Sequence, residues 1–171
     1  MSAEFNRRLD NLIRFGTIAE VDYAAAKARV KSGQILTVFL PFLTFRAGQT
    51  KTWSPPTVGE QCIILAAGGE FTTACVLVGL YTQTAPSHSP DVHVFEFEDG
   101  ARIEYNHATG TLNVTGMKLI NIDCPQINIK GNIQIDGSVT STGDMVAGGI
   151  SQIKHIHGGV KGGPDKTGAP A

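Results

Sequence analysis

The regular spacing of glycines in the last third of the sequence restricts the fold of this chain more than any other feature. Glycines recur at intervals of six residues, at Gly131, Gly137, Gly143 and Gly149. Around them apolar residues alternate with polar ones; these are Ile120, Ile122, Ile127, Ile129, Ile133, Ile135 and Val139. Because residues i and i+2 of an extended strand point to one face, the alternation predicts strands with one apolar face. Glycines that permit a bend after each short strand are typical of stacked β-units.

A single copy of this region carries too little apolar surface to fold alone. Each six-residue unit offers one or two apolar side chains, whereas ordering a chain costs about 1–2 kcal/mol per residue. Winding several copies together solves the problem, since each inward isoleucine or valine then meets its symmetry mates. We therefore expect residues 92–150 to form an intertwined β-helix made by a homotrimer. The alternative, a flexible glycine-rich linker, does not explain the alternation of isoleucines.

Two histidines follow the last repeat, His155 and His157, separated by Ile156. In an extended chain both imidazoles face one side, so three chains around an axis supply six. Six neutral imidazoles suit octahedral Fe²⁺, Ni²⁺ or Co²⁺ better than tetrahedral Zn²⁺. We expect iron, the most available of these, at a saturated site with no open position for catalysis. Residues 151–171 would then be a metal-binding apex whose glycine- and proline-rich tail folds back as a cap.

The first half of the chain predicts a short helix followed by a barrel. Phe5, Leu9, Leu12 and Ile13 recur at helical spacing, which indicates an amphipathic helix within residues 1–16 that stops at Gly16. Residues 17–85 read as short strands with glycine turns between them; the runs are 18–21, 28–30, 36–40, 61–66 and 75–81. Strands of this number and size favour a small closed barrel of the OB type, with an SH3-like barrel as the alternative. The fold class is therefore mainly β.

Charge and composition weaken two other functions. Net charge is −1, whereas nucleic-acid binding usually leaves a basic footprint. An OB module that grips single strands would use Trp53 with Arg46, Lys51 and Tyr81, but Trp53 fits a core or interface anchor better. A polysaccharide-degrading enzyme needs a carboxylate pair in a cleft. Its candidates would be Glu96, Glu98, Asp99 and Glu104, whose alternation is typical of the solvated face of a strand. We therefore expect neither a nucleic-acid partner nor an enzyme.

Three motifs, in this order along the chain, resemble the phage baseplate assembly protein V family. Residues 53–61 (WSPPTVGEQ), Gly68, Gly69 and residues 76–81 (VLVGLY) look like its OB barrel. Residues 97–105 (FEDGARIEY) look like the start of its β-helix, where Asp99-Gly100 also predicts a hairpin turn. His155 and His157, with the tail at residues 167–170 (TGAP), look like its iron-binding apex.

The resemblance implies a structural spike at the tip of a contractile phage or R-type pyocin tail. Its OB collar would bind baseplate hub and tail-tube proteins, and its tip would breach the host outer membrane when the sheath contracts. Some members of the family hold calcium and chloride ions inside the helix. Residues 1–14 carry charges where the apolar core of a signal peptide would lie. We therefore expect synthesis in the host cytoplasm and a final place in the virion or pyocin baseplate.

Overall fold

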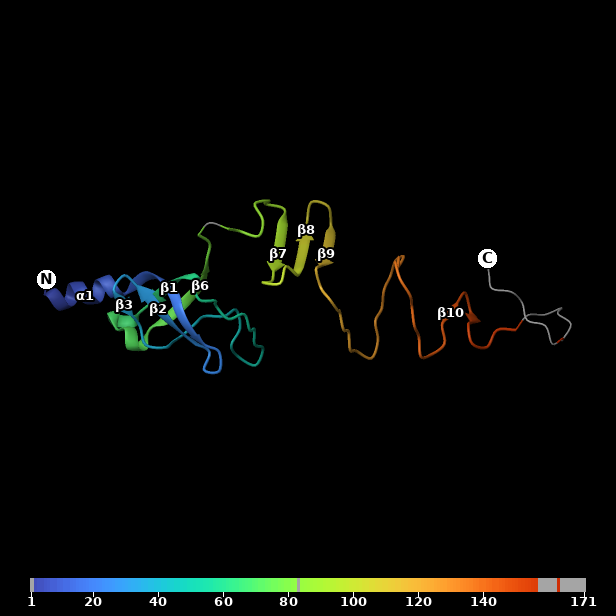
Figure 1. The fold of residues 1–171 in the computed structure, drawn as a ribbon, viewed down its shortest axis with the longest axis horizontal. Helices are drawn as coiled ribbons and strands as arrows, with labels where there is room; N and C mark the ends of the chain where they lie inside the picture. The colour runs from blue at the N-terminus through green and yellow to red at the C-terminus, as the bar shows by residue number, and fades with distance from the viewer. Residues whose placement is uncertain (1, 83, 157–162, 164–171) are drawn as a thin grey trace. The chain divides into compact units, whose positions relative to one another are not determined.

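The computed structural model describes residues 2–82, 84–156 and 163. By its internal contacts the chain divides into two units, Met1–Ile120 and Asn121–Ala171, which are described separately here (Figure 1). The first unit holds a short helix, a sheet that curls into a barrel and a smaller three-stranded sheet; the second holds a small hairpin and long irregular stretches. The mainly β fold class predicted from the sequence is confirmed. Within the described residues, no helix is long and apolar enough to cross a bilayer.

Helix α1 spans Ala3–Asn11 and is held at both ends by local contacts. The N–H of Phe5 donates to the Ser2 hydroxyl at 3.2 Å, which caps the first turn. Glu4 binds the guanidinium groups of Arg7 and Arg8, and these hydrogen bonds lower the pKa of Glu4 to about 2. The helix thus has a charged side of ion pairs, and its apolar side chains Phe5 and Leu9 lie exposed.

The helix is shorter than the sequence predicts. Strand β1 (Ile13–Asp22) begins two residues after it, so Ile13 and Gly16 are paired in the sheet and not helical. Gly16 does not stop the helix. Instead it lets two strands approach closely, since a Cβ there would lie 2.3 Å from Val30 Cγ1 and 2.9 Å from the Lys31 carbonyl oxygen. The end of helix α1 is therefore set by the packing of β1 against the strand that holds Val30, and not by the helical spacing of Leu12 and Ile13.

The larger sheet contains six strands in the order β3-β2-β1-β5-β6, with β4 paired to β2. All of its pairings are antiparallel. Beyond β1, its strands are β2 (Lys27–Ser32), β3 (Ile35–Leu36), β4 (Leu40–Pro41), β5 (Gln61–Leu65) and β6 (Cys75–Leu80). Two short 3-10 helices, η1 (Ala67–Gly69) and η2 (Phe71–Thr73), join β5 to β6.

The two edges of this sheet meet, which closes the barrel. Phe42 bridges Val76, and the N–H of Leu43 donates to the Val76 carbonyl at 2.9 Å. The core inside consists of small and branched side chains: Ile18, Ala28, Val30, Leu40, Cys62, Ile64, Ala66, Ala74 and Val76. Burial is the main reason that the pKa of the Cys62 thiol is raised to about 11, with Glu60 adding a smaller effect.

One predicted strand, at residues 36–40, is split in two. Thr37 lies between β3 and β4, and its hydroxyl accepts a hydrogen bond from the Val30 N–H at 2.9 Å. The same hydroxyl donates to the Val38 carbonyl at 2.8 Å. Thr37 is buried, so these contacts satisfy its polar group while they interrupt the ladder.

The smaller sheet comprises β7 (Val92–Glu96), β8 (Arg102–Asn106) and β9 (Thr111–Thr115), paired in chain order. The predicted turn between β7 and β8 is confirmed. Gly100 has φ of +84°, and its N–H donates to the Phe97 carbonyl at 2.9 Å. The Asp99 carboxylate accepts from the Ala101 N–H at 3.0 Å, so both residues of the Asp-Gly pair shape the turn.

The second unit has little regular structure in a single chain. Its strands among the described residues are β10 (Val146–Ala147) and β11 (Ile150–Ser151), which form a small hairpin. Residues 121–145 contain no strand and are drawn as a thin coil in Figure 1. Gly131 and Gly137 have φ of +148° and +149°, which side chains other than glycine rarely adopt. Gly131 and Gly137 therefore occupy backbone positions that need glycine, whereas Gly143 does not.

Candidate metal-binding apex

The β10–β11 hairpin positions the residues that precede the predicted apex. Val146 pairs with Ser151 and Ala147 with Ile150. The N–H of Gln152 donates to the Met145 carbonyl at 2.9 Å, which extends the ladder by one step. A turn over residues 152–154 then leads directly to His155.

Asp144 and Ser151 hold this turn together. The Asp144 carboxylate accepts from the Ile153 N–H at 3.2 Å, and the Ser151 hydroxyl accepts from the Lys154 N–H at 2.8 Å. The Ser151 side chain also hydrogen-bonds to Asp144, and together with backbone N–H groups it keeps the pKa of Asp144 below its ordinary value. Asp144 therefore favours its ionised form here. The sequence did not single out either residue for this role, although an acidic residue beside a two-glycine turn is a typical turn stabiliser.

His155 is oriented by its own turn. Its Nδ1 lies 2.9 Å from the Ser151 carbonyl oxygen and 3.2 Å from that of Gln152. A carbonyl oxygen only accepts, so Nδ1 carries a proton and donates to these carbonyls. Metal-binding histidines typically donate their second ring nitrogen to a backbone carbonyl in this way. The backbone around His155 therefore fits a ligand that binds through Nε2.

His157, the second predicted ligand, lies outside the described residues. Among residues 2–82, 84–156 and 163, no group of three or more His, Cys, Asp or Glu side chains is placed to hold a metal ion. A complete ligand set around His155 would therefore need His157, further copies of the chain, or both.

Comparison with known proteins gives matches to the barrel and to the C-terminal part of the chain. The family profile described as the Type VI secretion system/phage-baseplate injector OB domain matches residues 14–81. A second profile, the GpV Apex motif, matches residues 149–171, which include both histidines. The spike protein of Escherichia phage P2 is 43% identical over 145 residues, which cover 84% of this chain and 64% of that protein.

This chain thus carries a phage-baseplate injector OB domain and a GpV Apex motif, and it is similar to a phage spike protein. The OB domain predicted from the sequence is thereby confirmed, and the apex motif falls where the histidine pair was predicted. The chain spans 64% of the length of the phage P2 relative that it matches.

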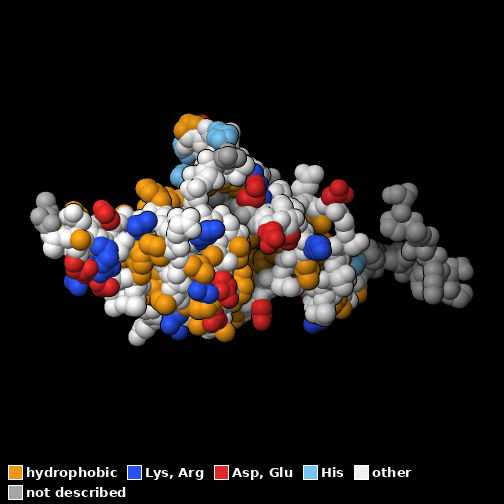
Figure 2. Space-filling view, turned by 60° about the vertical axis from the view of Figure 1, so that its left-hand side comes forward, with side chains coloured by type: hydrophobic (Ala, Val, Ile, Leu, Met, Phe, Trp, Pro, Cys, Tyr) orange, Lys and Arg blue, Asp and Glu red, His pale blue; other side chains and the backbone are white. Residues whose placement is uncertain are grey.

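The candidate nucleic-acid residues of the OB domain do not form one described cluster. The Trp53 ring lies 6.0 Å from the Phe42 ring, at a tilted angle. Lys51 bridges Ala47, and Arg46 is tied to Thr52 through backbone contacts. Hydrophobic side chains mix with basic and acidic ones on the face in Figure 2. Trp53 thus contacts the Phe42 ring but is 59% exposed, so it is not a core anchor, and its role as an interface anchor stays a prediction.

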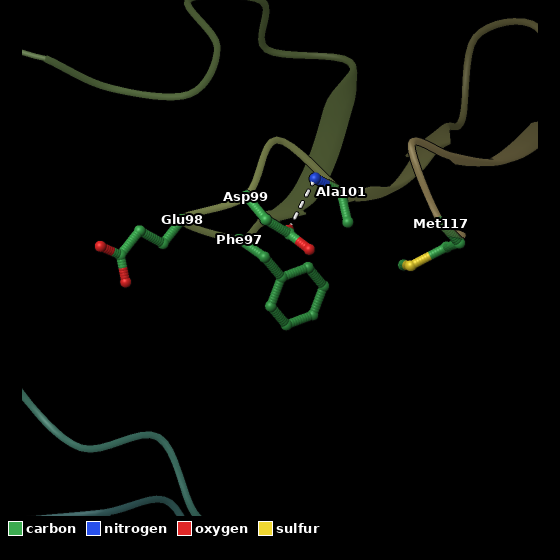
Figure 3. Close-up of a pocket in the computed structure, with 5 residues that line it drawn as sticks. All are labelled: Phe97, Glu98, Asp99, Ala101 and Met117. Carbon is green, nitrogen blue, oxygen red and sulfur yellow. Dashed lines mark hydrogen bonds between the residues drawn. The ribbon is translucent and has the colours of Figure 1, made fainter. Parts of the chain in front are cut away.

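Three of the four candidate carboxylates of the enzyme hypothesis, Glu96, Asp99 and Glu104, make hydrogen bonds or ion pairs within the sheet and its turn. Arg102 binds Glu96 at 2.9 Å and Glu104 at 2.6 Å, and all three side chains are at least partly exposed. Glu98 and Asp99 lie in the β7–β8 turn, beside a shallow hollow (Figure 3). The acidic residues of this sheet thus serve an ion-pair network and a turn.

Proposed function

We propose that this chain is the structural spike at the tip of a contractile phage or pyocin tail. Three copies wind together as a needle, the OB barrels form a collar on the baseplate hub and tail tube, and the tip breaches the host outer membrane. The matches to the injector OB domain and the GpV Apex motif, and the similarity to the phage P2 spike protein, support this role. The division of the chain is part of the proposal: a helix that the structure bounds at Ala3–Asn11, a barrel that continues to residue 85, a β-helix at 92–150 and an apex at 151–171.

The exposed apolar side chains before the apex are the main observation in favour of the proposal. Ile120, Ile122, Ile127, Ile129, Ile133, Ile135 and Val139 are each more than half exposed in one chain. Soluble monomers rarely leave such a continuous set open to water. The segments that carry these side chains form no strand and no sheet pairing among the described residues. Two further copies would supply both the missing strand partners and the cover for these side chains.

A β-helix of three chains suits a device that transmits force along its axis. Each extended segment would hydrogen-bond to a neighbouring copy, so no backbone edge would remain open. Gly131 and Gly137, with φ near +150°, would turn the chain at the same height in each copy. Shearing one segment would then require breaking contacts to two neighbours together.

The apex would be tied by iron bound to His155 and His157 of the three copies. The Nδ1 contact of His155 to the Ser151 carbonyl supports this assignment, because it leaves Nε2 as the basic nitrogen. The ion would supply a crosslink between chain ends. With all positions taken by imidazoles, it would offer no site for substrate, and we propose no enzymatic activity. Calcium and chloride ions inside the helix, implied by the family resemblance, would be further structural ions.

Two measurements on the purified full chain test the proposal. Sedimentation equilibrium should give three times the chain mass, and elemental analysis should give one iron per three chains. The variant His155→Ala/His157→Ala should lose the iron and remain trimeric, whereas His88→Ala, a histidine far from the apex in sequence, should keep both. A monomeric wild-type protein would refute the needle, and a trimer without stoichiometric metal would refute the apex.

A further inference from the structure

The stretch from Asp144 to His155 forms a local hydrogen-bonded unit within one chain. Asp144 lies two residues before β10, and His155 follows β11 after a single turn. The longest hydrogen bond in sequence terms within this unit joins residues nine positions apart. A single copy can therefore form the unit before any other copy or any ion is bound.

The Asp144 carboxylate ties the beginning of this unit to its end. The Ile153 N–H donates to it at 3.2 Å, and the Ser151 hydroxyl and the N–H groups of Gln152 and Met145 are further donors. An ionised carboxylate can accept several hydrogen bonds at once, and such charge-assisted bonds are the stronger ones. Asp144 therefore holds the turn after β11 against the segment before β10.

The Ser151 hydroxyl extends this constraint to the residue directly before His155. The Lys154 N–H donates to that hydroxyl at 2.8 Å. Because an N–H only donates and an ionised carboxylate only accepts, the hydroxyl accepts from Lys154 and donates to Asp144. The hydrogen bonds from Lys154 through Ser151 to Asp144 thus have one direction, which depends on the carboxylate.

The Ser151 carbonyl holds both the backbone and the ring of His155. It accepts from the His155 N–H at 3.1 Å, and Nδ1 of the ring lies 2.9 Å from the same oxygen. The Gln152 carbonyl oxygen lies 3.2 Å from Nδ1. The two residues that orient His155 are therefore residues whose own donors converge on Asp144.

These two carbonyls also decide where the His155 ring keeps its proton. The hydrogen bond that one ring nitrogen makes sets the tautomer of a neutral imidazole. A proton on Nδ1 of the neutral ring leaves the lone pair on Nε2, the form that binds a metal ion through Nε2. His155 is exposed and lines an open hollow of about 510 Å³ with Ser151 and Lys154, so an ion can reach the ring.

We infer that Asp144 is a positioning residue for the apex, which holds His155 in one orientation and one tautomer before a metal ion binds. The inference rests on the iron site proposed above and adds the group that prepares its ligand. Loss of a hydrogen-bond partner behind a ligating residue typically weakens metal binding about 10–100-fold. Loss of the Asp144 carboxylate should therefore speed metal release while the chains stay assembled.

Iron release from the loaded full chain tests this role. Asp144→Ala should release iron to an excess of a ferrous chelator at least about tenfold faster than wild type. Asp144→Asn keeps an acceptor oxygen for the Ile153 N–H and should restore most of the wild-type rate. Asp123→Ala removes another exposed carboxylate of the second unit and should release iron as wild type does. Equal rates for Asp144→Ala and Asp123→Ala, in protein that sediments as wild type does, overturn the inference.

The tautomer of His155 in metal-free protein gives a readout that does not depend on iron. Nitrogen-15 spectra of histidine-labelled full chain at pH 8 show which ring nitrogen is protonated, and the His155→Ala variant assigns the signal. Wild type should carry the proton on Nδ1, whereas Asp144→Ala should show a mixture of tautomers. Ser151→Ala keeps the carbonyl but removes the hydroxyl, so it should shift in the same direction and replaces Asp144→Ala if that variant does not assemble.

The two readouts separate failure of the inference from failure of the iron site. An unchanged His155 tautomer in both Asp144→Ala and Ser151→Ala overturns the positioning role, whatever the iron content. A wild-type protein that binds no iron refutes the iron site, and the tautomer then still decides whether Asp144 orients His155.

Discussion

Ile129→Ala measures how much of the spike's stability comes from the bare apolar stripe. Ile129 is 64% exposed in one chain, and full burial of an isoleucine side chain stabilises by about 1.5–3 kcal/mol. Assembly would therefore gain about 1–2 kcal/mol from this side chain in each chain, or about 3–6 kcal/mol per trimer. Truncation to alanine removes most of that gain and leaves a cavity on the axis, which adds to the loss.

The matched control is Lys130→Ala, at the neighbouring position on the opposite face of the same extended segment. Surface substitutions of this kind change stability by about 0.5 kcal/mol or less. The free energy of unfolding is measured by guanidinium titration at one fixed chain concentration, since the stability of an oligomer depends on concentration. If Ile129→Ala and Lys130→Ala shift the midpoint equally, the stripe does not lie inside an assembly.

Three further outcomes are expected. Gly137→Ala should destabilise the assembled protein by about 1–3 kcal/mol per chain, because φ of Gly137 is +149°. The control Gly143→Ala should be nearly neutral in the same titration, because Gly143 has no positive φ and no neighbour where an added Cβ would lie. Cys62, buried and with its pKa raised to about 11, should react with a thiol reagent at pH 8 only after unfolding; Cys124 should react in monomers and be protected in trimers. The pKa of Asp144 is lowered in the folded chain, so its contribution is present above its unfolded pKa and is lost as pH falls through the folded value. The Ile153 amide resonance should therefore titrate with a midpoint below 3.8 in wild type and not in Asp144→Asn.

Local pattern was sufficient for the strands and turns that depend on near neighbours. The Asp99-Gly100 pair predicted the hairpin turn between β7 and β8 because such a turn depends on residues within a few positions. The end of helix α1 was not predictable in this way. Leu12 and Ile13 fit helical spacing and a strand equally well, and the close approach of Gly16 to Val30 decides between them.

The place of the apex could be predicted from the sequence, but its supporting contacts could not. The GpV Apex motif matches the stretch that holds His155 and His157, whose role as metal ligands stays a prediction that depends on the trimer. The hydrogen bonds that orient His155 come from Ser151 and the turn beside it, which no spacing rule identifies. The interruption between β3 and β4 at Thr37 was also not predicted. There the Thr37 hydroxyl takes the place of a backbone hydrogen-bond partner, which a pattern of apolar residues does not show.

Gly69 lies where helix α1 packs against the barrel. A Cβ at this position would lie 2.3 Å from the Arg8 carbonyl oxygen and 2.5 Å from its Cα, so the helix backbone rests where a methyl group would otherwise be. Asn11 adds a 3.4 Å hydrogen bond to the Gly69 carbonyl from the same side. The methyl group of an alanine at position 69 would therefore displace the helix from the barrel. A Gly69→Ala substitution would thus alter how helix α1 is held without touching the glycine repeats.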